Sequence, residues 1–173
     1  MVEKFSKKLA TLIHEANPQS SVPVLNYSIS VTLNFLAILI ITILIGYFFD
    51  RLAETMTALL SFVLLRAFSG GYHLKSLDGC VVVTVGIMVL IPYIPMASIT
   101  TVVLTAISAL LVLIQAPNNV YDEVRVPREK HLFFKIVSVL IVCSNFVFIS
   151  PILSLSFFVQ SILLIPKKEV TSC

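Results

Sequence analysis

The chain has 173 residues, of which 58% are hydrophobic and only 12% are charged. Soluble domains carry about twice that share of charged residues, so the composition excludes a soluble globular enzyme. The net charge of +3 is too small to indicate a nucleic-acid partner. Because the apolar residues come in long runs, residues 1–173 are expected to form a single polytopic membrane domain with the lipid bilayer as its solvent.

The first segment, residues 3–15, is expected to form an amphipathic helix on the membrane surface. Apolar residues recur there at helical spacing, and lysines lie between them: Phe5, Leu9, Leu12 and Ile13 alternate with Lys4, Lys7 and Lys8. A helix that is merely solvated is the alternative.

Six apolar runs predict an all-α integral membrane protein with about six transmembrane or re-entrant helices. The run 28–49 contains no charged residue and, at about 1.5 Å per residue, is long enough to cross a bilayer core. The run 53–69 is apolar only in its middle and is either a short crossing or a re-entrant helix. The other four runs form two pairs, 80–91 with 94–114 and 136–149 with 152–165. Prolines separate the two runs of each pair.

Basic residues predict the topology of these helices. Lysine and arginine occur in the N-terminal segment, in the polar segments 66–79 and 115–135, and in the tail, but not in the connections 92–95 and 150–151. By the positive-inside rule, six crossings place both termini and both polar segments in the cytoplasm. If the second segment were re-entrant, the number of crossings would change, and the later segments would lie on the other side of the membrane.

The stretch from Arg66 to Cys80 differs from the rest of the chain, because it combines glycines with a histidine, a cysteine and charges of both signs. Ionisable groups between apolar spans mark a candidate site. The Cys80 thiol is a candidate nucleophile and His73 a candidate base. In an unbroken helix they would lie about 10.5 Å apart, too far for proton transfer, so a bend at Gly70, Gly71 and Gly79 is expected.

Asp78 is expected to be the N-cap of a helix that begins at Gly79, and an orienting role beside His73 is the alternative. Cys80 would then lie in the first helical turn, where the helix dipole favours a thiolate and free amides can hold an oxyanion. The competing interpretation of the whole segment is a packed cysteine and a solvated histidine.

The three cysteines show neither metal-ligand spacing nor a paired arrangement, so no metal, no cofactor and no disulfide framework are expected. Cys143 lies within an apolar run, where a thiol stays protonated and packs as a small apolar group. Cys173, the last residue, is expected to be a spectator.

Arg66, Gly71, His73 and Cys80 form the pattern R-x4-G-x-H-x6-C, which resembles the AgrB family of integral-membrane cysteine peptidases that process the AgrD propeptide in Gram-positive bacteria. The resemblance extends to the length, the basic N-terminus, the Gln115-Ala-Pro-Asn-Asn loop entry and the Lys-rich tail. It implies a bacterial cell membrane, Cys80 as the nucleophile and His73 as its base or ion-pair partner. It also implies a thioester acyl-enzyme that an internal Cys or Ser of the propeptide converts into a thiolactone or lactone ring.

The resemblance makes an AgrD-like propeptide the expected partner and leaves a homodimer and a part in export open. Arg66 is expected either to anchor a substrate carboxylate or to stabilise the fold at the membrane edge. Four basic residues of the second polar segment either receive the acidic tail of the propeptide or only keep the loop inside: Arg125, Arg128, Lys130 and Lys135.

Two other functions compete with a peptidase. A small transporter or peptide-binding membrane protein would place polar or charged groups in several spans, and these spans are nearly free of charge. A thiol–disulfide enzyme needs a cysteine couple, and the sequence shows none.

Overall fold

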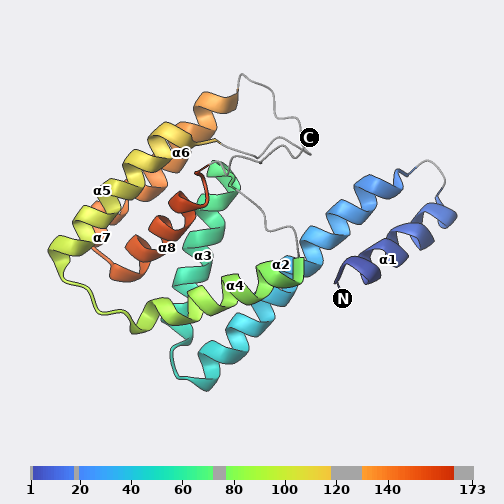
Figure 1. Ribbon diagram of the computed structural model, residues 1–173, viewed down its shortest axis with the longest axis horizontal. Coiled ribbons are helices and arrows are strands. Elements are labelled where there is room, and N and C mark those ends of the chain that lie inside the picture. The colour runs from blue at the N-terminus through green and yellow to red at the C-terminus, as the bar shows by residue number, and fades with distance from the viewer. Residues whose placement is uncertain (1, 18–19, 72–76, 118–129, 166–173) are drawn as a thin grey trace, which may run out of the picture.

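A computed structural model describes residues 2–17, 20–71, 77–117 and 130–165, and these residues form an all-α fold (Figure 1). The helices in chain order are α1 (Val2–Ala16), α2 (Val22–Phe48), α3 (Leu52–Ser69), α4 (Leu77–Leu90), the 3-10 turn η1 (Ile91–Tyr93), α5 (Ser98–Gln115), α6 (His131–Cys143), α7 (Asn145–Phe148) and α8 (Pro151–Ile162).

Within the described residues, four helical segments are long and apolar enough to cross a membrane: α2, α3, α5, and the segment His131–Phe148 that α6 and α7 make together. Two shorter apolar helices, Asp78–Tyr93 and Pro151–Ile162, complete the set. The chain is therefore a membrane protein of the all-α class, as the apolar runs predict. The run 53–69, whose length was ambiguous in the sequence, is a continuous helix of crossing length.

Prolines explain where two helices differ from the expected boundaries. α2 begins at Val22, before the expected start at residue 28, with Pro23 in its first turn. Proline is tolerated there because amides of the first turn have no partner within the helix. α5 begins only at Ser98, after Pro92 and Pro95 have kept the preceding chain out of the α-helix.

α3 is the central helix, in contact with α2, α4, α6 and α8. Two apolar clusters pack against it. The first joins α2, α3 and α4 through residues such as Ile38, Leu59 and Met88, and the second joins α3, α5, α6 and α8 around Leu65 and Phe157. Many other large apolar side chains stay on the outside of the bundle, as expected for helices in lipid.

α1 lies along the N-terminal half of α2 (Figure 1). The contact uses small residues: Ser6 and Ala10 are buried, Ser6 Oγ donates to Asn26 Oδ1 at 2.9 Å, and Ser30 Oγ donates to Ser6 Oγ at 2.7 Å. Small residues four positions apart allow two helices to approach closely. Phe5 and Leu12 remain exposed, so α1 still presents an apolar surface after packing on α2.

Turns gather at the two ends of the bundle (Figure 1). At one end the Arg51 guanidinium lies 5.9 Å from the centre of the Tyr93 ring, which joins the α2–α3 turn to η1. The α7–α8 turn lies at this end as well. At the other end the last turns of α3 and α8 meet, close to the start of α6. Arg66 and the two glycines that follow α3 lie at this second end, whereas α4, whose first turn carries Cys80, begins beside α2.

Candidate functional site

α3 ends in a turn made by two glycines. Gly70 has φ 74° and ψ −144°, and Gly71 has φ 128°, backbone conformations that side chains with a Cβ rarely adopt. A Cβ on Gly71 would also lie 3.1 Å from Gln160 Nε2 and 3.3 Å from the Leu163 carbonyl oxygen. The expected break between Arg66 and Cys80 is therefore present at Gly70 and Gly71. Gly79 takes no part in it, because it lies inside α4.

Gln160 of α8 closes this turn from the other side. Its side chain is fully buried, and its amide nitrogen donates to the Gly70 carbonyl oxygen and to Ser69 Oγ at 3.2 Å. Its carbonyl oxygen accepts from Arg66 Nη1 at 3.4 Å. Gln160 was not among the residues predicted from the sequence, although a single carboxamide within the apolar run 152–165 indicates an interhelical hydrogen bond.

Arg66 lies half-buried in the last turn of α3. Besides Gln160, its guanidinium faces the Phe62 ring, 5.9 Å from the ring centre, and interacts electrostatically with the Cys80 thiol. The structure thus brings two of the four residues of the sequence pattern, Arg66 and Cys80, into one environment. Gly71 adjoins it, since its Cβ position is 3.7 Å from Arg66 Nη1.

Cys80 lies in the first turn of α4 as a half-buried free thiol, with Sγ 3.9 Å from Thr84 Oγ1. The expected N-cap role of Asp78 is wrong. α4 already includes Leu77, so Asp78 lies within the first turn, exposed, where a carboxylate complements the positive end of the helix dipole. His73, the candidate base, lies outside the described residues.

The remaining candidates lie apart from this cluster or cannot be placed. Lys130 is exposed immediately before α6, and Lys135 is half-buried in its first half. Arg125, Arg128 and Cys173 lie outside the described residues, and Cys143 is a half-buried free thiol at the end of α6. Contact of the basic residues with a substrate tail stays a prediction.

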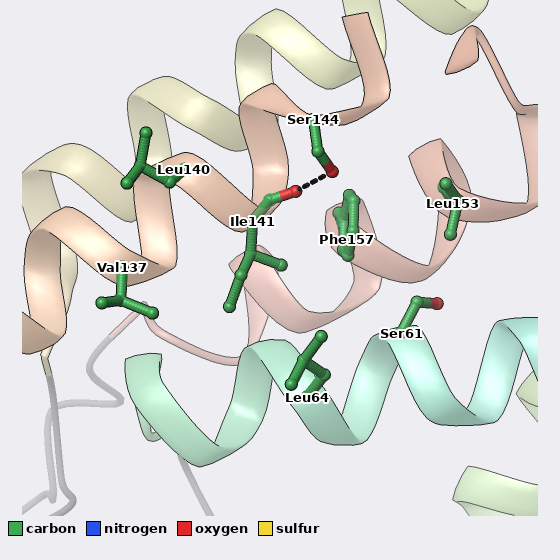
Figure 2. A pocket seen from close by; sticks show the side chains of 8 residues that line it. All are labelled: Ser61, Leu64, Val137, Leu140, Ile141, Ser144, Leu153 and Phe157. Carbon is green, nitrogen blue, oxygen red and sulfur yellow. Dashed lines mark hydrogen bonds between the residues drawn. The ribbon is translucent and has the colours of Figure 1, made fainter. Parts of the chain in front are cut away.

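A groove of about 420 Å³ between α3, α6 and α8 does not belong to the candidate site (Figure 2). Its polar residues are only Ser61 and Ser144, and the Ser144 hydroxyl donates to the Ile141 carbonyl oxygen at 2.7 Å. Among the residues that the structure describes, no group of three or more His, Cys, Asp or Glu is arranged to hold a metal ion. The groove offers apolar contact, and neither Arg66 nor Cys80 lines it.

Fold and site together define a small membrane protein of the all-α class with a half-buried thiol, a half-buried arginine and a glycine turn at the end of α3. The family model AgrB, accessory gene regulator B, matches residues 2–166, and the chain belongs to this family. No curated protein and no solved structure gives a significant match. Membership of the family links the chain to the processing of a quorum-sensing propeptide, with an AgrD-type propeptide as the partner.

Proposed function

We propose that the chain is a membrane-embedded cysteine endopeptidase that cleaves the C-terminal part of an AgrD-type propeptide, with Cys80 as the nucleophile. The observation that supports this proposal is the half-buried Cys80 thiol in the first turn of α4, within electrostatic range of the Arg66 guanidinium. A helix N-terminus and a nearby cation are both typical surroundings of reactive cysteines. His73 enters the proposal as the general base from the sequence pattern alone.

The proposed reaction has two steps. In the first, Cys80 Sγ attacks the scissile carbonyl carbon, the thiol proton passes to His73 and from there to the leaving amine, and the upstream part of the propeptide remains as a thioester. In the second, an internal Cys or Ser of the propeptide attacks the thioester carbonyl, its proton passes through His73, and the Cys80 thiolate leaves. The second step consumes no water, so a site that limits water favours ring closure over hydrolysis.

The test is cleavage of a cognate AgrD-type propeptide by membranes that contain the Cys80→Ala variant. We expect no detectable cleavage, whereas Cys143→Ala, the matched control at the other described free thiol, keeps wild-type cleavage. A propeptide whose internal Cys or Ser is changed to Ala should leave a thioester on Cys80, detectable as an adduct that hydroxylamine removes. Cleavage retained by Cys80→Ala would overturn the proposal.

A further inference from the structure

Gln160 is the residue through which α8 reaches the candidate site. It lies 90 positions along the chain from Gly70, to whose carbonyl oxygen its amide donates, and 94 positions from Arg66, from which it accepts. α8 otherwise presents apolar and small polar side chains to α3 and α5. Gln160 is thus the polar link between the end of α8 and the end of α3.

The two ends of the carboxamide do different things. The amide nitrogen binds the Gly70 carbonyl oxygen and the Ser69 hydroxyl and so holds the end of α3 against α8. The carbonyl oxygen faces Arg66 Nη1 and limits the positions that the guanidinium can take. A fully buried carboxamide with both ends bonded has no freedom to rotate, because rotation would leave buried polar groups unpaired.

We propose that Gln160 is a positioning residue of the peptidase, which holds Arg66 and the Gly70–Gly71 turn in the arrangement that the reaction at Cys80 needs. This inference rests on the proposed function. Gln160 acts through Arg66 and the turn and does not itself touch the reacting atoms.

The decisive variant is Gln160→Met, which keeps the length of the side chain and removes both hydrogen-bonding ends. Ser161→Ala is the matched control, because Ser161 is also fully buried on α8 but donates to the Ser108 and Phe157 carbonyl oxygens, away from the site. Both variants are made in a Cys143→Ala/Cys173→Ala background, so that N-ethylmaleimide reports on Cys80 alone.

The first readout is the rate at which N-ethylmaleimide alkylates Cys80 in membranes at neutral pH, without substrate. Because a fixed guanidinium stabilises the negative charge of an attacking sulfur, Gln160→Met should slow alkylation about tenfold. Arg66→Gln should do the same, and the double variant should be no slower than Arg66→Gln alone. Ser161→Ala should react at the parent rate.

The second readout is cleavage of an AgrD-type propeptide, where Gln160→Met should lower kcat with little change in KM. Parent-like alkylation and cleavage by Gln160→Met would overturn the inference. A double variant slowed by the product of the two single effects would overturn it as well. If Gln160→Met does not accumulate in membranes, Gln160→Asn replaces it, since its carboxamide keeps the site polar but is one methylene too short to hold both Arg66 and the Gly70 carbonyl oxygen. Its alkylation rate should then fall toward that of Arg66→Gln, and a parent-like rate would overturn the inference.

These outcomes separate the inference from the function on which it rests. Cleavage retained by Cys80→Ala overturns the proposed function. An inactive Cys80→Ala beside a fully active Gln160→Met overturns the role of Gln160 only.

Discussion

At the scale of single residues, Gly71 carries two constraints at once. Its φ of 128° is one that residues with a Cβ rarely adopt, and the position of its missing Cβ is 3.1 Å from Gln160 Nε2. To admit a methyl group, the Gln160 side chain would have to shift by a few tenths of an ångström, and the backbone would be strained in addition. The glycine of the R-x4-G-x-H-x6-C pattern is thus a requirement of packing as well as of backbone conformation.

We expect Gly71→Ala to lower propeptide cleavage strongly and to destabilise the fold by about 1–3 kcal/mol, because it strains the backbone and displaces Gln160. Cleavage and unfolding in detergent are the measurements. Gly86→Ala is the matched control. Gly86 lies in α4 with no atom within 4 Å of its Cβ position, so alanine there should be tolerated and should favour the helix. A Gly71→Ala variant with wild-type activity and stability would contradict the described turn.

At the scale of elements, a polar cluster ties the α7–α8 turn to α5. The Asn145 side chain donates to Thr105 Oγ1 at 2.9 Å and to the Ser150 carbonyl oxygen at 3.2 Å, and it accepts from the Ser150 amide at 3.0 Å. Ser154 Oγ accepts from Thr105 Oγ1 and donates to the Thr101 carbonyl oxygen. With Pro151 in the first turn of α8, these bonds satisfy backbone groups that the break between the helices leaves open.

Asn145→Ala should therefore lower the free energy of unfolding by about 1–2 kcal/mol, the upper range for interhelical hydrogen bonds in membranes. It should leave kcat unchanged in the folded protein, because this turn lies at the end of the bundle opposite Gln160. Unfolding by SDS titration and cleavage kinetics measure the two effects. The control is Ser138→Ala, since the buried Ser138 bonds only within its own helix, to the Phe134 carbonyl oxygen. Equal stability of the two variants would contradict the bridging role.

At the scale of the whole molecule, the helices next to the site are short. α4 has 14 residues and α8 has 12, whereas α5 has 18. At about 1.5 Å per residue, α4 and α8 fall well short of a bilayer core of about 30 Å. Figure 1 shows α4 crossing the bundle beside α2, and α8 ending next to the last turn of α3. A helix shorter than the bilayer core has at least one end inside it, and we expect the site to lie at such ends, below the membrane face that the basic segments predict to be cytoplasmic. This placement limits access of water to an acyl-enzyme.

Recession predicts a difference between two alkylating reagents applied to inverted membrane vesicles. N-ethylmaleimide should label Cys80 much faster than a bulky sulfonated maleimide does. In a variant without native cysteines, Lys130→Cys, at the exposed start of α6, should react well with both. Tyr93→Cys, at the other end of the bundle, should react with the sulfonated reagent only from the extracellular side. Equal labelling of Cys80 by both reagents would contradict a recessed site.

The all-α membrane class follows from the sequence alone. In lipid, apolar runs of crossing length can pair their backbone N–H and C=O groups within the run only by forming helices. The sequence also singled out Arg66, Gly71 and Cys80, since charge, glycine and thiol are rare in such runs. It placed Asp78 wrongly, because the start of a helix depends on the residues before it as well as on a good capping side chain. The hydrogen bonds of Gln160 to Arg66 and to the Gly70 carbonyl oxygen could be found only in the tertiary structure. These contacts join residues up to 94 positions apart. The spacing of apolar residues in the sequence indicates which face of a helix is polar, but it does not indicate which other helix packs against that face.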